Sequence, residues 1–364
     1  MIKTSAPGRI CLFGEHQDYL GLPVITAAIN LRIYVSGKPN GLRTMHIDLP
    51  DINNEEEFEL PAKDKEVPYN KERDYFRSVF NVLRRQGVEI KSGWDCQVHG
   101  TIPINSGTSS SSALCVAWAR FLTEISTQQK PEFKNPYFIA KAAHLAEVAE
   151  FHEPGGMMDH YASAMGGLLY QEFSEPVRLQ PFALQLGTFV LGDSLQPKDT
   201  KKILARVKFG VLEAVEIIKK REANFDLKNA RFDQLRQYRS LLSTDQMDVL
   251  QGALLNRDLT REAKELMSGD TLDERQFGKL LTEHQKILAG LLKISTPKID
   301  RMLQAALNAG AYGGKINGSG GGGCMFVYAP ENAQKVAQAI ELQGGRAYII
   351  KVDDGVRVES SDGD

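Results

Sequence analysis

The sequence predicts an α+β protein of two lobes, and three observations lead to this fold class. The chain has 364 residues, more than the roughly 100–200 that one core usually serves. Its first third reads as strands and much of its second half reads as helix. The tail returns to strand, helix and strand, which favours an α+β second lobe over a parallel doubly wound sheet. We place the lobes at residues 1–185 and 186–364, so a cleft between them is expected.

The first lobe is expected to begin with a sheet. Lys3–Phe13, Val24–Lys38 and Trp94–Thr101 are rich in β-branched or alternating residues, which is typical of strands. Between them, Glu72–Arg85 carries apolar residues at the i, i+3, i+4 spacing of an amphipathic helix. Further helices are expected at Ser110–Ile125, at Pro136–Phe151 and from Met157, and further strands at Gly166–Gln171, Val177–Pro181 and Thr188–Gly192.

The second lobe is expected to be mainly helical before its final strands. Nearly all of Lys201–Ala309 has a helical pattern. Strands are expected at Met325–Tyr328 and Ala347–Val352, with a helix at Ala333–Leu342 between them.

Composition excludes several classes of protein. Hydrophobic content of 42% and charged content of 25% are ordinary for a folded chain. A net charge of −2 with both signs intermixed provides no general attraction for nucleic acid or an anionic membrane. No stretch approaches the ~20 apolar residues of a membrane span, and no leader pattern opens the chain, so we expect a cytoplasmic protein. The four scattered cysteines have no metal-binding spacing and are expected to be buried thiols.

A serine-rich segment, Ile102–Ala113, joins a predicted strand to a predicted helix. Such a junction offers free backbone N–H groups and the positive end of a helix dipole, which suit a phosphate, and a serine hydroxyl can add a Mg²⁺ ligand. The alternative is a simple serine N-cap, but four serines and a glycine are more than a cap requires. No Gly-Lys-Ser/Thr closes the segment, so it is not a Walker A loop.

A glycine-rich segment, Asn317–Cys324, formally contains GxGxxG. The strand predicted after it, where a dinucleotide-binding loop would open a helix, argues against a Rossmann site. A flexible linker is the alternative. Because apolar structure flanks the segment on both sides, we expect its backbone to approach a ligand or another loop closely.

Two acidic segments complete the candidate site. Glu15, His16 and Asp18 follow the first strand and could bind sugar hydroxyls, although a polar turn or, more weakly, a metal site would use the same residues. Glu147 lies late on a predicted helix, and Asp159 follows a Pro-Gly-Gly turn at a helix start. An acid in a first turn often compensates the helix dipole. Phosphoryl transfer, however, needs one carboxylate near the attacking hydroxyl and another group for the metal.

These segments, in this order, resemble the GHMP superfamily of kinases, named for galacto-, homoserine, mevalonate and phosphomevalonate kinases, with the galactokinases nearest. Gly8–Tyr19 resembles the N-terminal galactokinase signature, and Gly156–His160 resembles its Gly-Ile-Met-Asp-Gln motif. The resemblance continues through Glu283–Gln285, Ser295–Asp300 and Asn317–Cys324, so it covers almost the whole chain.

The resemblance implies a fold and a reaction. The first lobe would be like domain 2 of ribosomal protein S5, the second would be ferredoxin-like, and ATP and a sugar would meet in the cleft. The reaction implied is ATP-dependent phosphorylation of a sugar at its anomeric hydroxyl, with galactose as the first candidate. The implied partners are therefore small molecules, with no nucleic acid or membrane, and we expect a monomer or weak homodimer.

The resemblance also assigns roles to residues. Arg9 and Asp159 would be the catalytic pair, with Asp159 either the base or an orienter of the hydroxyl, and Arg9 would keep Asp159 ionised. Ser111 and Glu147 would hold Mg²⁺. The sugar would contact Glu15, His16, Asp18 and Gly156. ATP would contact Gly107, Thr108, Ser109, Ser110, Ser111, Ser112, Gly318 and Gly320.

Several departures from the galactokinase pattern keep the substrate open. Gln17 stands in place of threonine, His160 in place of glutamine, and Asn105-Ser106 where glycines are usual. Leu20-Gly21-Leu22 replaces an Asn-Gly-Gly turn, and Lys201–Val215 contains no tyrosine to contact a sugar. Another hexose, a pentose, a uronic acid or a mevalonate-type acid remain alternatives, as does a catalytically silent sugar sensor. The acidic first loop favours a polyhydroxylated substrate, because it would repel an anionic one.

Overall fold

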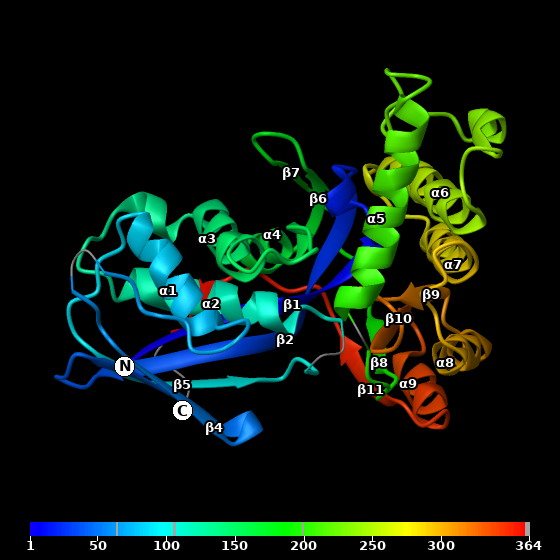
Figure 1. Cartoon of the computed structure of the whole chain (residues 1–364). Coiled ribbons are helices and arrows are strands. Elements are labelled where there is room, and N and C mark those ends of the chain that lie inside the picture. Colours follow the sequence, from blue (N-terminus) through cyan, green and yellow to red (C-terminus); the bar gives the residue numbers. More distant parts are fainter. Residues whose placement is uncertain (63–64, 105–106, 199, 361–364) are drawn as a thin grey trace.

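The computed structural model describes residues 1–62, 65–104, 107–198 and 200–360, and they form two sheets with helices packed against each (Figure 1). The first sheet has eight strands in this part of the chain. They are β1 (Ile2–Phe13), β2 (Val24–Pro39), β3 (Thr44–Leu49), β4 (Asn54–Glu59), β5 (Trp94–Gly100), β6 (Leu168–Glu172), β7 (Arg178–Pro181) and β12 (Arg357–Val358). Their order is β12-β1-β2-β5-β3-β4, with β6 paired to β2 and β7 to β6. Only the β3–β5 contact among these pairs is parallel.

Four helices cover one face of this sheet (Figure 1). They are α1 (Tyr75–Arg85), α2 (Ser110–Glu124), α3 (Pro136–His144) and α4 (Met158–Met165). The central helix is α2, whose Trp118 and Phe121 rings stack 5.5 Å apart while Phe76 of α1 meets Trp118 edge-on. Because α2 packs against β1 and β2 through apolar side chains along its length, its first turn has a fixed position relative to these strands.

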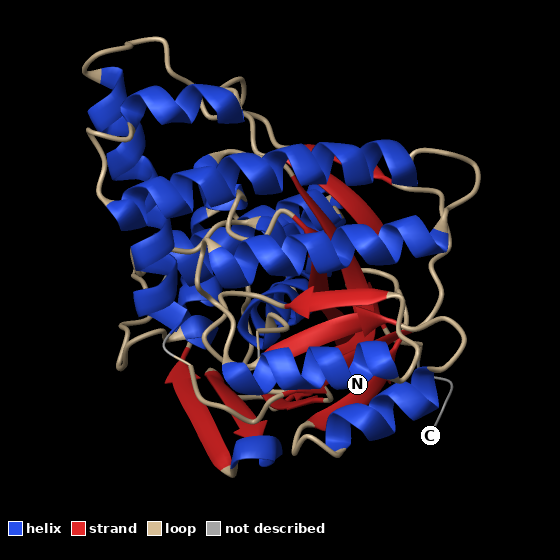
Figure 2. Ribbon diagram, turned by 90° about the vertical axis from the view of Figure 1, so that its right-hand side faces the viewer, coloured by secondary structure: helices blue, strands red, loops and turns tan. Residues whose placement is uncertain are grey.

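The second sheet has the strand order of a ferredoxin-like lobe. Its strands are β8 (Phe189–Asp193), β9 (Gly313–Ile316), β10 (Cys324–Tyr328) and β11 (Arg346–Ile350). They are antiparallel in the order β11-β8-β10-β9, which is 4-1-3-2 when they are numbered along the chain. Helices α8 (Pro297–Asn308) and α9 (Ala333–Glu341) pack on one face. Seen from the side of this lobe, helices stand in front of and above the strands (Figure 2).

A shared apolar core joins the two sheets. Phe13 of β1 and Ile25 of β2 pack in one cluster with Phe189 and Phe326 of the second sheet and with Phe277. Phe277 belongs to α7 (Glu274–Gly290), which lies beside α6 (Thr244–Met267); α5 (Thr200–Lys219) packs against α6 in a separate cluster. No helix in the described ranges is long and apolar enough to cross a membrane.

The strands and helices expected from the sequence are present, with differences in their limits. The helical stretch expected over Lys201–Ala309 is interrupted between α5 and α6, where loops surround a short 3₁₀ helix at Phe232–Tyr238. The helix expected to reach Phe151 changes after His144 into one π-helical turn, Leu145–Ala149. Strands β3, β4, β9 and β12 were not predicted, because their hydrogen-bonding partners, rather than a long apolar pattern of their own, define them.

The end of the chain returns from the second sheet to the first. Arg32 on β2 is 2% exposed and binds this tail through Nη1 to Asp353 Oδ2 at 2.7 Å and Nη2 to the Gly355 carbonyl at 2.7 Å. Its Nε donates to Ser5 Oγ, also at 2.7 Å. One buried guanidinium therefore fastens the tail across β1 and β2.

We predict that Arg32→Met lowers the free energy of unfolding by about 3 kcal/mol, because it leaves the partly buried Asp353 carboxylate and the carbonyls of Asp354 and Gly355 without their donor. Urea unfolding measures this. Arg357→Met is the matched control, since Arg357 pairs with the same tail but is 41% exposed, and it should cost at most about 1 kcal/mol. Equal losses in the two variants would contradict the role given to Arg32.

Candidate active site

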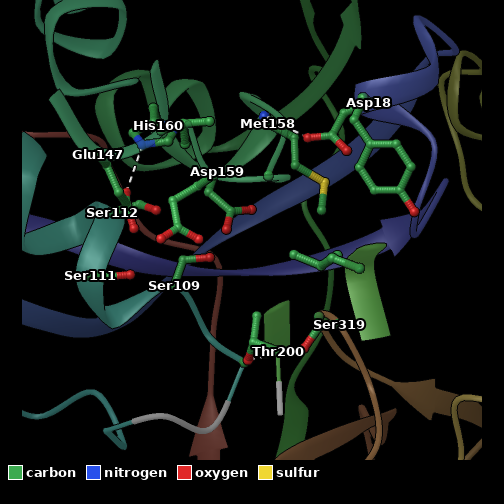
Figure 3. A pocket seen from close by; sticks show the side chains of 18 of the residues that line it. Asp18, Ser109, Ser111, Ser112, Glu147, Met158, Asp159, His160, Thr200 and Ser319 are labelled. Atoms are coloured by element: carbon green, nitrogen blue, oxygen red, sulfur yellow. Dashed lines mark hydrogen bonds and ion pairs between the residues drawn. The ribbon is translucent and has the colours of Figure 1, made fainter. Parts of the chain in front are cut away.

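Most of the residues singled out in the sequence line one pocket between the two lobes (Figure 3). The pocket is bounded by the end of β1, the starts of α2, α4 and α5, and the glycine-rich segment. Thr108 and Gly320 do not line it, and Asn105 and Ser106 lie outside the described residues. The predicted residues that line it are Arg9, Glu15, His16, Asp18, Gly107, Ser109, Ser110, Ser111, Ser112, Glu147, Gly156, Asp159 and Gly318.

Arg9 and Asp159 form an ion pair that lines the pocket, with the arginine side chain buried and the aspartate side chain 26% exposed. Arg9 lies on β1 and is 3% exposed, and its Nε donates to Asp159 Oδ1 at 2.7 Å. Burial alone would raise the pKa of Asp159, but the Arg9 charge and the nearby Ser109 hydroxyl outweigh it, so this pKa is lowered from its ordinary value. The carboxylate is therefore ionised at neutral pH.

The glycine-rich segment holds the serine-rich segment against β1. Asn317 is fully buried; its Oδ1 accepts the Cys11 N–H at 2.9 Å and its Nδ2 donates to the Gly107 carbonyl at 2.8 Å. A Cβ on Gly318, which has φ +77°, would lie 2.7 Å from the Gly107 carbonyl oxygen. The expected close backbone approach is thus to another loop, and glycine permits it.

Thr108 and Gly320, which do not line the pocket, contact other parts of the protein instead. The Thr108 carbonyl accepts the Arg9 N–H at 3.2 Å, so this residue ties the serine-rich segment to β1. Gly320 faces Ile294, whose carbonyl oxygen would lie 2.6 Å from a Cβ on this glycine.

Oxygen ligands gather at the start of α2. Ser111 and Ser112 lie in its first turn, and Glu147 approaches them from the π-helical turn Leu145–Ala149 (Figure 3). Burial would raise the pKa of Glu147, but the contact with His160 and the hydroxyls of Ser111 and Ser112 lower it. An ionised carboxylate beside a serine hydroxyl fits Mg²⁺, which prefers oxygen ligands and usually takes one or two carboxylates together with phosphate and water.

The loop after β1 presents two carboxylates to the pocket. Glu15 is 1% exposed; its Oε2 accepts from Lys315 Nζ at 2.6 Å, while Oε1 has no hydrogen-bond partner among the described residues. Asp18 Oδ2 accepts the Met158 N–H at 3.2 Å. Burial, and then the charge of Asp159, raise the pKa of Asp18 to about 6.

His16 and Gly156 shape this loop. The carbonyl of Ser319 can only accept, so His16 Nε2 donates to it at 3.0 Å, and Nδ1 accepts from the Tyr19 hydroxyl at 2.6 Å. Burial lowers the pKa of His16 to about 4, so the ring is neutral. A Cβ on Gly156 would lie only 1.9 Å from Asp18 Oδ2, so the loop can close over α4 only with glycine there.

Sequence reasoning missed the second-lobe wall of the pocket. Lys198 precedes α5 and donates from Nζ to Ser319 Oγ at 3.2 Å. Burial, and then the charge of Arg9, lower the pKa of Lys198 to about 8. No motif marks a lysine in a loop, and the family pattern places its sugar-contacting tyrosine later in the chain, in the stretch that corresponds to Lys201–Val215. Tyr75, Thr200, Lys201 and Leu204 also line the pocket and were not predicted.

Comparison with known proteins connects this arrangement to a family. Residues 2–39 match the galactokinase galactose-binding signature, residues 74–167 the GHMP kinases N-terminal domain and residues 263–345 the GHMP kinases C-terminal region. The mevalonate kinase of Thermococcus onnurineus is 30% identical over 373 residues, which cover 98% of this chain and 98% of that protein.

Solved structures share the fold. The structure of Lactococcus lactis galactokinase complexed with galactose has a TM-score of 0.83 at 20% identity, and the match covers 98% of this chain and 94% of the galactokinase chain. The structure of Methanococcus jannaschii mevalonate kinase has a TM-score of 0.71 at 19% identity, and the match covers 97% of this chain and 98% of the mevalonate kinase chain. These similarities confirm the two-lobed α+β fold expected from the sequence.

We predict that Asp18→Asn stabilises the protein at neutral pH. The pKa of Asp18 is about 6 in the folded chain and has a reference value of 3.8, so the folded state binds this proton more tightly than the unfolded state does. Its ionisation therefore costs stability as pH rises from about 4 through about 6. The variant should gain about 2–3 kcal/mol in free energy of unfolding at pH 7.5. Urea unfolding should show this gain shrinking towards pH 4; a gain independent of pH would contradict the raised pKa.

Proposed function

The chain belongs to the GHMP kinase family, and we propose that it transfers the terminal phosphate of ATP to the anomeric hydroxyl of a sugar, with galactose as the first candidate. As a family member it is an ATP-dependent kinase. The observation that carries the proposal is the ion pair between Arg9 and Asp159, which lines the same pocket as the serine-rich start of α2.

A polyhydroxylated acceptor suits the loop after β1. The open Glu15 Oε1 and the Asp18 carboxylate are hydrogen-bond acceptors that hydroxyl groups can satisfy. This loop lies inside the segment that matches the galactokinase galactose-binding signature. Both observations support a sugar over an acid, because an acceptor carboxylate would face two further carboxylates.

The donor phosphates would lie at the start of α2. The N–H groups of its first turn and the Ser110–Ser112 hydroxyls would bind their oxygens. Ser111 and Glu147 would hold Mg²⁺, which supplies charge neutralisation on the phosphates when it is bound.

Asp159 would act mainly by orienting the acceptor hydroxyl. A carboxylate whose pKa is held low by Arg9 is a weak base. Phosphoryl transfer passes through a loose transition state in which positioning and charge stabilisation contribute most. Arg9 would stabilise the negative charge on the transferring group, and the products would be a sugar 1-phosphate and ADP.

A mevalonate-type acid is the second candidate, and Lys198 is the observation that favours it. Its side chain lines the pocket and has no carboxylate within ion-pair distance among the described residues. Such a cation suits an acceptor carboxylate, and the 30% identity to an archaeal mevalonate kinase adds to this alternative. With a sugar acceptor, the same lysine would face the transferring phosphoryl group.

We predict ADP release that depends on an added sugar. The assay measures ATP turnover with free hexoses, pentoses, a uronic acid and mevalonate. Galactose or a related hexose should give the highest kcat/KM, and Asp159→Ala should lower it by at least about 10³-fold, as expected when a group that positions and polarises the reactants is removed. Phosphorylation of mevalonate alone would overturn the sugar assignment. No turnover with any acceptor would contradict the kinase activity and favour a catalytically silent sugar sensor.

Lys198→Met separates the two roles of this lysine. We expect kcat with the sugar to fall about 10- to 100-fold, the loss typical of one charge-assisted hydrogen bond, while KM for the sugar changes little. A comparable rise in KM for an acidic acceptor, with kcat unchanged, would instead assign Lys198 to an acceptor carboxylate. Lys219→Met, at the far end of α5, is the control and should change neither constant.

A further inference from the structure

The carboxylate of Glu147, which lies beside the Ser111 and Ser112 hydroxyls, has a short hydrogen bond to the side chain of His160. Nε2 of His160 lies 2.7 Å from Glu147 Oε2, and the two side chains are 2% and 12% exposed (Figure 3). An ionised carboxylate only accepts hydrogen bonds, so Nε2 carries the hydrogen and donates it. The donor lies on α4, and the acceptor lies on the π-helical turn that continues α3, the helix against which α4 packs.

The His160 ring is itself fixed in place. The His144 ring meets it edge-on, with centroids 5.3 Å apart and planes at 80°. Nδ1 of His160 is buried and has no hydrogen-bond partner in the part of the chain that the structure describes. Among the described residues, the bond to Glu147 is therefore the polar contact of this ring, and it satisfies a buried N–H that would otherwise lack a partner.

The geometry assigns a use to this bond. A glutamate has three rotatable bonds, and a hydrogen bond to one carboxylate oxygen restricts them before any ligand binds. Since Oε2 is engaged by His160, Oε1 is the oxygen left for a cation beside Ser111. The cost of ordering the carboxylate is then met by folding instead of by metal binding.

We propose that His160 is a positioning residue that orients Glu147 to receive Mg²⁺, an inference that rests on the proposed kinase function. In this role it acts through Glu147. Glutamine, the residue usual at this position in the galactokinase pattern, can place an amide N–H where Nε2 lies. Leucine has similar bulk and no donor.

The test measures binding of a fluorescent ADP analogue to the full chain, titrated with Mg²⁺ and repeated in EDTA. His160→Leu should raise the Mg²⁺ concentration at half-effect by about 10-fold or more and leave the affinity in EDTA unchanged. His160→Gln should stay within about threefold of the unsubstituted protein. In a Glu147→Gln background, His160→Leu should add little, because both changes then remove the same contribution.

Two results would overturn the inference: an unchanged Mg²⁺ requirement in His160→Leu, or an equal loss of affinity with and without Mg²⁺, which would show a general effect on the pocket. If His160→Leu does not fold, His160→Asn replaces it, since its shorter side chain cannot reach Glu147 and the same loss is expected. Failure of the proposed function looks different, because the unsubstituted protein would then show no Mg²⁺-dependent binding of the analogue at all.

Discussion

The site depends on one backbone oxygen, the carbonyl of Gly107. It accepts the Arg9 guanidinium at 2.7 Å and the Asn317 side-chain amide at 2.8 Å, from residues 98 and 210 positions away in the sequence. Through this oxygen, β1, the serine-rich segment and the glycine-rich segment hold each other in register. Because Arg9 also binds Asp159, the position of the Asp159 carboxylate is set by the same contact that positions the start of α2.

Charge in the pocket is only partly balanced within the protein. Arg9 offsets Asp159 and Lys315 offsets Glu15, whereas Asp18 has backbone donors but no ion pair among the described residues. Burial and the nearby Asp159 charge raise the pKa of Asp18, so its ionisation lowers the stability of the folded state. Costs of this kind are common where side chains are arranged for a ligand, since the same groups would be better solvated or paired in a site without one.

The features that could be predicted from the sequence are those formed by residues adjacent in the chain. The serine-rich junction, the acidic loop after β1 and Asp159 after its Pro-Gly-Gly turn are all readable because each depends on adjacent residues. Because these segments occur in the same order as in the GHMP kinases, their resemblance to that family could also be recognised. Lys198 and Lys315 were missed because their roles come from contacts with distant residues, Ser319 and Glu15. The same is true of β9, whose Gly313 and Gly314 have no side chains to form a pattern and which exists only through pairing with β10.

The apolar cluster around Phe13, Phe189, Phe277 and Phe326 has a mechanical consequence. Domains that share a large hydrophobic contact do not swing apart as rigid bodies, because separation would expose that surface to water. A hinge motion between the two halves of this enzyme would separate apolar side chains that pack together from both sheets. Lys201 and Glu153, which pair with each other and line the pocket, can separate without moving this shared core.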